Sequence, residues 1–338
     1  MQQLLSSQSK FKDQSISMEF HILLEFVGTL GETQNIIFFK NGKLMTYITL
    51  LTLLINSLFY IFNIFSIKPL IRDFLTEQNL VIAAAPGSPE FANIFINMKR
   101  DLGIFIGVEW IYLLVNSTIS LFLATVTISA SAMAYRGSKD MTFKTLLLRA
   151  ARSWKRPCVT WFYTTLLCTG YICLLLAILF PLSLINQRPG PLFFALYTVL
   201  FVVASVSYVY MTVFWTLALV ISVLEEMYGI EALGKAAQIV KGMKIHGFLL
   251  NLVFITLSCV LVQGLRLISY EQPLATKVII GFVVISFISL VRLVWLVAYS
   301  IFYYQCKKIH GEDQVELQEN VGYIKIPTTA PIISENIP

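Results

Sequence analysis

The sequence contains few charged residues. Asp, Glu, Lys and Arg together make up 13% of its 338 residues, against about 25% in soluble domains. Hydrophobic residues make up 57%, and the mean hydropathy is +0.75. A chain this apolar is not a soluble globular protein, a disordered chain or a nucleic-acid-binding domain, even with a net charge of +6. The composition indicates a polytopic membrane protein.

The sequence also lacks the motifs of the common enzyme classes. Its three histidines, His21, His246 and His310, are scattered and give no metal-ligand spacing. It has no phosphate-binding loop, no G-x-S-x-G and no H-E-x-x-H segment. None of its five cysteines forms a C-x-x-C pair. We therefore expect a non-enzymatic protein with no catalytic residue, cofactor or metal.

A signal peptide is not expected, because residues 1–7 carry no positive region followed by an apolar one. The first long apolar run begins near Leu44, and a spanning helix needs about 20 mostly apolar residues. Six runs meet that length, so we expect an all-α fold with six transmembrane helices. They cover about Leu44–Ile67, Leu102–Ala132, Cys158–Leu184, Leu192–Leu224, Gly247–Ile268 and Val278–Tyr304.

Positive charge is distributed unevenly between the loops. With six spans the two termini share one side of the membrane, and most of the 25 Lys and Arg residues fall on that side. The positive-inside rule places both termini in the cytosol. The membrane that the protein spans is either that of the endoplasmic reticulum or the plasma membrane. We expect a cytosolic segment over 1–43, a transmembrane domain over 44–305 and a disordered cytosolic tail over 306–338. The longest outer loop, at about 68–101, contains a turn at Pro86–Pro89.

Basic amphipathic segments precede the first, third and fifth spans. We expect interfacial helices at 27–43, 140–156 and 230–244. The helix at 140–156 has an apolar face of Phe143, Leu147, Ala150 and Trp154 and basic residues Lys144, Arg149, Arg152, Lys155 and Arg156. Three units, each an interfacial helix followed by a helical hairpin, would result. The alternative is that every cytosolic loop is basic and amphipathic by the topology rule alone.

Local patterns predict details of two of these helices. Asp140 is a suitable N-cap for the helix at 140–156. In the helix at 230–244, Glu231 and Lys235 have the i,i+4 spacing of an ion pair. The predicted apolar face of that helix is Ile230, Leu233, Ala237 and Val240.

The segment Ser222–Ala232, with Lys241-Gly242 after it, resembles a family of uncharacterised plant six-span transmembrane proteins. In that family a span ends in a V-L-E stretch, a helix begins at a Y-G-x-x-A motif, and a K-G pair follows. Arg152–Pro157 and Leu24–Lys43 look like the same family, and the resemblance covers about residues 18–305. A more distant similarity is to the membrane domain of bacterial glycerophosphodiesterase-type proteins. The resemblance implies the six-span fold and its topology, and no activity.

Two ionisable residues lie inside predicted spans, where a charge is costly and often functional. Glu109 lies in the outer part of the second span, and Arg292 lies deep in the sixth. Polar residues could line a pathway with them: Asn116, Ser117, Ser120, Thr127 and Ser131 in the second span, and Ser205, Ser207, Tyr208, Tyr210 and Thr212 in the fourth. The alternatives are an interfacial Glu109, an Arg292 bonded to neighbouring helices, and hydroxyls that serve helix packing. A Glu109–Arg292 ion pair is a further alternative.

Two main functional hypotheses follow, and a third, a membrane-embedded lipid enzyme, ranks last because only the distant bacterial similarity supports it. The first is a membrane protein that acts in membrane organisation and binds anionic lipid headgroups or membrane-protein partners through its basic interfacial helices. Each Lys or Arg near an anionic leaflet contributes about 1 kcal/mol to such binding. The second is a small transporter or channel that uses Glu109 and Arg292. Cys306, just before Lys307 and Lys308, is a candidate for S-palmitoylation; an unmodified thiol is the alternative.

Overall fold

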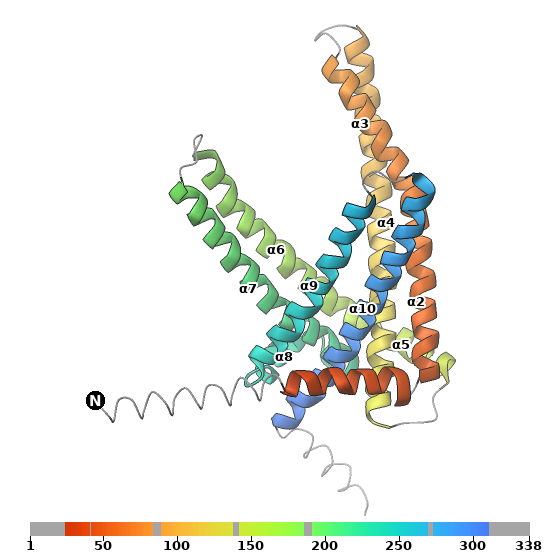
Figure 1. Cartoon of the computed structure of the whole chain (residues 1–338), viewed down its shortest axis with the longest axis vertical. Coiled ribbons are helices and arrows are strands. Elements are labelled where there is room, and N and C mark those ends of the chain that lie inside the picture. Colours follow the sequence, from red (N-terminus) through yellow and green to blue (C-terminus); the bar gives the residue numbers. More distant parts are fainter. Residues whose placement is uncertain are drawn as a thin grey trace, which may run out of the picture.

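The computed structural model describes residues 24–40, 42–83, 89–137, 142–185, 191–269 and 273–310. Within these ranges the chain is helical apart from short turns, and no residue lies in a strand (Figure 1). The predicted all-α fold is therefore confirmed. The first 23 residues, and most of the predicted tail from residue 311 onward, lie outside the described residues.

Six helices are long and apolar enough to cross a membrane, as the sequence predicts. Each satisfies its backbone hydrogen bonds internally, which a bilayer requires of any spanning segment. The chain is therefore a multi-pass membrane protein. The spanning helices are α2 (Gly42–Phe62, continued by the π-helix η2, Asn63–Ile67), α4 (Pro89–Tyr135), α6 (Lys155–Ile185), α7 (Pro191–Leu224), α9 (Lys244–Ser269) and α10 (Leu274–Ile309).

The segment predicted to connect the first two spans on the outer side, at about 68–101, is helical in its described part. Helix α3 (Lys68–Ala83) follows η2 and packs along the first part of α4. This two-helix extension projects past the ends of the other helices (Figure 1). The sequence argument counted only apolar residues, and helices with many polar positions escape that count. The predicted turn at Pro86–Pro89 lies mostly outside the described residues.

Short helices gather at the opposite end of the bundle, which we call the basic end. Residues 24–35 form a helix, followed by the π-helix η1 (Ile36–Lys40), and cross the lower ends of the spans (Figure 1). Helix α5 (Phe143–Ser153) precedes α6, and α8 (Ile230–Ile239) precedes α9. The order of a short helix followed by a hairpin of two long helices thus recurs three times.

Two details of the short helices differ from the prediction. Thr142 is the N-cap of α5, whereas Asp140 lies outside the described residues. In α8 the buried face is Ala232, Ala236 and Ile239, with Val240 after the helix, whereas Ile230 is 67% exposed and Ala237 is exposed. Helix α8 packs on α7, and small alanine side chains allow that close approach. The packing of α8 on α7, and not the sequence of α8 alone, determines which of its faces is buried.

The hydrophobic core lies at the basic end. One cluster joins α4, α7, α8, α9 and α10, with Leu217, Tyr299 and Phe302 fully buried. A second joins η1, α2, α4, α5 and α10, around Ile48 and Leu146. Away from this end, α6 and α7 diverge from the other spans (Figure 1), and no residue in the most apolar part of the Lys155–Pro181 span is buried within the protein.

Candidate functional site

Arg292 stands at the midpoint of α10. It lies about 26 Å from either end of the candidate span Ala275–Ile309, at 1.5 Å per residue. Its side chain is exposed, and its Nη1 donates a hydrogen bond to Ser120 Oγ on α4 at 3.2 Å. That bond occupies one of the five guanidinium N–H donors. A cation with donors to spare therefore lies at a depth where lipid offers it no partner.

Three cavities meet at Arg292. The central pocket, of about 20 Å³, has room for roughly one water molecule. The α3-side cavity, of about 340 Å³, lies between α2, α4 and α10. The basic-side cavity, of about 370 Å³, is lined from α4, α6, α7, α9 and α10. Of the described residues that line the three cavities, Arg292 alone carries a charge, and it lines all of them.

The α3-side cavity has several polar side chains in a largely apolar wall. Asn56 Nδ2 donates to Ser289 Oγ at 2.7 Å, and Tyr60 Oη donates to the Lys277 carbonyl at 3.2 Å. These pairs join α2 to α10 at the height of the cavity. The polar lining residues are Asn56, Tyr60, Asn63, Tyr112, Asn116, Ser289 and Arg292.

The basic-side cavity combines hydroxyl and aromatic side chains. The buried Asn251 donates from Nδ2 to the Val209 carbonyl at 3.0 Å and to Thr212 Oγ1, so it fixes α9 against α7. The Thr216 hydroxyl donates to the Thr212 carbonyl of its own helix at 2.8 Å. The polar and aromatic lining residues are Thr164, Tyr208, Thr212, Trp215, Thr216, Asn251, Arg292 and Trp295.

The cavities succeed one another along the bundle. Asn63 lies about 32 Å along α2 and η2 from Gly42, whereas Asn251 lies about 10 Å along α9 from Lys244. Arg292 stands between these levels. Beyond the basic-side cavity, the core cluster around Tyr299 and Phe302 fills the bundle. Three cavities that share Arg292 therefore lie in series, on the α3 side of a packed apolar core at the basic end.

The helix at 24–35 lies at the basic end, beside this packed core. Thr29 Oγ1 lies 3.2 Å from His246 Nε2 on α9 and donates to Gln305 Oε1 on α10 at 3.0 Å. Thr29, Thr33 and His246 are buried. The helix therefore connects the ends of α9 and α10 beside the packed core of the basic end.

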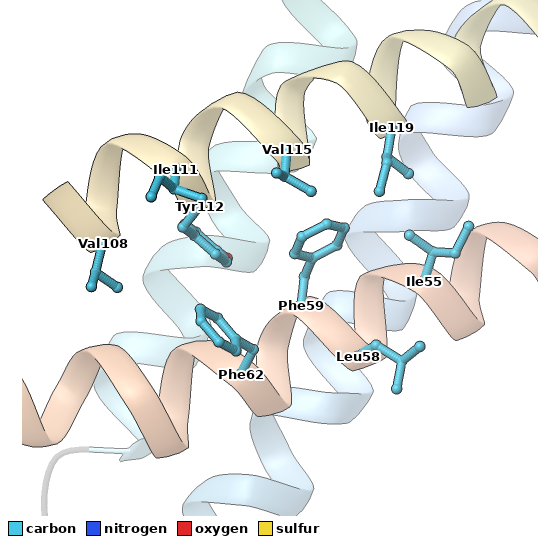
Figure 2. A pocket seen from close by; sticks show the side chains of 9 residues that line it. All are labelled: Ile55, Leu58, Phe59, Phe62, Val108, Ile111, Tyr112, Val115 and Ile119. Carbon is cyan, nitrogen blue, oxygen red and sulfur yellow. The ribbon is translucent and has the colours of Figure 1, made fainter.

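An apolar groove of about 650 Å³ adjoins the α3-side cavity (Figure 2). Side chains of α2 and α4 point into the space between the two helices, with Phe59 and Tyr112 projecting into it. The same two residues also line the α3-side cavity. The groove residues are Ile55, Leu58, Phe59, Phe62, Val108, Ile111, Tyr112, Val115 and Ile119. This surface is suited to contact with acyl chains.

The structure separates the two predicted intramembrane charges. Glu109 does not line any of the three cavities, and its Oε2 is buried without a hydrogen-bond partner within the described part of the chain. Ser120, and not Glu109, is the residue that accepts a hydrogen bond from Arg292. The predicted alternative of a Glu109–Arg292 ion pair is therefore not the observed arrangement.

The predicted polar stripes are only partly assembled at Arg292. Asn116, Ser120 and Thr127 of α4 and Tyr208 and Thr212 of α7 line the cavities. Ser117, Ser131, Ser205, Ser207 and Tyr210 do not. Sequence reasoning missed Asn56, Asn63, Asn251, Trp215 and Trp295. Asparagines inside apolar runs were the available signal, because an amide is costly in lipid.

The predicted basic residues lie at or next to α5, and most of them face outward. Lys144, Arg149, Arg152 and Lys155 are exposed. Arg156 differs, because its Nη2 lies 3.1 Å from Glu226 Oε1. Cys306, the predicted palmitoylation site, is fully buried with its Sγ 3.8 Å from Met243 Sδ, so acylation would require this packing to open.

The motif at 222–232 builds structure at the basic end. Glu225 pairs with Lys235 Nζ at 2.8 Å and accepts a hydrogen bond from Tyr303 Oη. Gly229 has φ 63°, which disfavours other residues. Its N–H donates to Thr160 Oγ1 at 2.9 Å, and a Cβ there would lie 3.2 Å from Tyr163. Lys235 thus has a tertiary partner that the i,i+4 rule does not anticipate.

Comparison with known proteins identifies a family and nothing further. Residues 17–325 match a family described as a domain of unknown function, DUF8558. No curated protein and no solved structure matches the chain. The chemistry of the site is therefore inferred from its geometry.

Proposed function

Since the chain belongs to the family of the domain of unknown function DUF8558, we propose a function from its geometry: a non-enzymatic membrane protein that binds an anionic solute at Arg292 and passes it across the membrane. The observation that carries the proposal is the exposed guanidinium at mid-span, shared by three cavities that contain no other charge among their described residues.

The electrostatics favour an anion. A lone guanidinium in a low-dielectric region attracts negative charge far more strongly than it would in water, and its unused N–H donors suit a carboxylate or phosphate. Asn and Ser side chains at the α3-side cavity replace part of the hydration that the solute loses. The packed core at the basic end then has to rearrange for the solute to leave, as in alternating access.

Flux in proteoliposomes tests the proposal. We would measure uptake of radiolabelled chloride, benzoate and phosphate by vesicles that contain the wild-type protein, Arg292→Gln or Arg292→Lys. We expect at least one anion to enter faster than into protein-free vesicles and Arg292→Gln to remove at least nine-tenths of the excess, on the order of a charge-assisted hydrogen bond. Arg292→Lys should retain part of it.

The matched control is Arg72→Gln. Arg72 is an exposed arginine on α3, outside the spans and remote from the three cavities. This variant removes the same charge and should leave the flux unchanged. Wild-type uptake equal to that of protein-free vesicles for all three anions, or equal uptake by wild type and Arg292→Gln, would refute the proposal.

A second candidate function is the binding of anionic lipid headgroups, and of membrane-protein partners, at the basic end. The observation that favours it is the exposed set Lys144, Arg149, Arg152 and Lys155 on one short helix and its junction with α6. Replacing all four with Gln should lower the retention of phosphatidylserine over phosphatidylcholine by roughly 1 kcal/mol per side chain. Native mass spectrometry of protein released from mixed nanodiscs measures it, and unchanged retention would exclude the idea.

The cytosolic placement of both termini is part of the same proposal, because it sets the basic end against the anionic leaflet. Labelling of a terminal tag in sealed cells tests it. Membership of the plant six-span family, and the distant similarity to bacterial glycerophosphodiesterase-type membrane domains, stay predictions.

A further inference from the structure

We infer that the basic-side cavity binds a small organic anion with one negative charge and an aromatic body. The inference rests on the proposed function, because it names the class of anion that meets Arg292. Its grounds are the charge count, the volume and the composition of the cavity wall.

The charge count selects a monovalent ligand. Arg292 is the sole charged residue among the described residues of the cavity wall. The hydroxyls of Thr212 and Thr216 donate to carbonyls of their own helix, at 2.8 Å each. Arg292 is therefore the one charged donor among the described residues of the wall, and the buried Trp295 Nε1–H is a neutral donor beside it. A second negative charge would enter a region away from water without a partner, which is strongly unfavourable.

The volume favours a ligand larger than a single halide ion. The cavity holds about 370 Å³, within the roughly 300–1,000 Å³ range of small-molecule sites. A halide would occupy a small fraction of it and leave the apolar wall uncovered. An organic body attached to the charged group would fill the remainder.

The wall favours an aromatic body. Tyr208 and Trp215 of α7 line the cavity and meet edge to face at 5.9 Å, and Trp295 lines it one turn along α10 from Arg292. Aromatic rings prefer such edge-to-face and offset partners, which strengthens binding over a saturated ring roughly two- to tenfold. The cation and the aromatic wall together specify an aromatic carboxylate.

Equilibrium binding of radiolabelled benzoate to the purified protein in nanodiscs tests the inference. Three unlabelled competitors isolate its parts: cyclohexanecarboxylate has the same charge and a saturated ring, phthalate has a second carboxylate, and phosphate has no organic body. We expect benzoate to bind, cyclohexanecarboxylate to compete two- to tenfold more weakly, and phthalate and phosphate to compete at least tenfold more weakly.

Variants assign the site. Arg292→Gln should weaken benzoate binding at least tenfold, and Arg72→Gln should leave it unchanged. Trp215→Leu removes one aromatic wall without touching the charge, so the preference for benzoate over cyclohexanecarboxylate should fall toward one. Size-exclusion profiles of the variants identify any that fail to fold, and Trp215→Leu provides the test if Arg292→Gln does so.

The outcomes separate the two proposals. Phosphate or phthalate binding as tightly as benzoate, with dependence on Arg292, overturns the ligand class and leaves the anion pathway standing. Absence of Arg292-dependent benzoate binding overturns the ligand class, and the flux measurement with chloride and phosphate then decides separately whether the anion pathway stands. Arg292-dependent binding of benzoate without flux supports the site and refutes passage across the membrane.

Discussion

Charged residues at the basic end and at mid-span are treated in opposite ways. At the basic end Glu225 meets both Lys235 and Tyr303, and its side chain is 15% exposed. At mid-span Arg292 is exposed to three cavities and bonded to a single hydroxyl, that of Ser120. The first charge is neutralised inside a packed core, and the second is left for something outside the polypeptide.

This contrast distinguishes a charge that stabilises the fold from a charge that serves a ligand. A charge that serves the fold is costly to remove, because its partner is left buried and unpaired. A charge that serves a ligand is costly to keep, because the fold gives it too few partners. Substitutions at the basic end and at mid-span should therefore have opposite effects on stability.

The largest effect is expected for Glu225→Gln. It removes the negative charge that lies 2.8 Å from Lys235 Nζ and weakens the Tyr303 hydrogen bond, which should lower the free energy of unfolding by about 2–3 kcal/mol. Thermal unfolding in detergent measures it. Glu226→Gln is the matched control, because Glu226 is 90% exposed and pairs with Arg156 at the surface; we expect a change below about 0.5 kcal/mol. Equal losses in both variants would contradict the comparison.

Gly247→Ala tests how tightly the basic end is packed. The added Cβ would lie 2.8 Å from Val213 Cγ1 and 3.0 Å from Phe302 Cζ, so the core has to shift, at a cost of about 1–3 kcal/mol. Gly264→Ala on the same helix meets nothing within 4 Å and should stabilise by up to about 1 kcal/mol. The same melting curves decide it, and a stabilised Gly247→Ala would mean that this core is loosely packed.

Gly229→Ala tests the turn before α8. Its φ of 63° and the approach of Tyr163 to 3.2 Å predict a loss of about 1–2 kcal/mol. Gly234→Ala, inside α8 with open space around it, should stabilise instead. If both variants shift the unfolding temperature in the same direction, the strained turn is not a feature of the folded protein.

Apart from the control variants, Arg292→Met is expected to have the smallest effect on stability, and the sign of that effect is opposite to that of the other three test variants. Removing a guanidinium that has one protein partner should leave the unfolding free energy unchanged or raise it by up to about 1 kcal/mol, while benzoate binding is lost. Melting curves and binding on one preparation measure both. A loss of 2 kcal/mol or more, about the loss expected for Glu225→Gln, would assign Arg292 to the structural class.

Much of the fold could be predicted from the sequence, and much less of the site. Six spans followed from apolar length, because lipid leaves the backbone no choice but helix. The face of α8 could not be predicted, because Ala237 and Ala236 are chemically identical and α7 decides which of them is buried. Arg292 was identified by its depth alone, whereas Asn56, Trp215 and Asn251 lie on three other helices and become its neighbours only in the folded protein.

From the sequence one can predict six helices long and apolar enough to cross a membrane, short amphipathic helices before every second span, and an arginine deep in the sixth. These properties depend on composition and on spacing within single helices, where the physics is local. That Arg292 faces open space, whereas Glu225 meets a lysine and a tyrosine, is seen only in the folded protein. Partnership between charges depends on distances across helices, and those are fixed by packing.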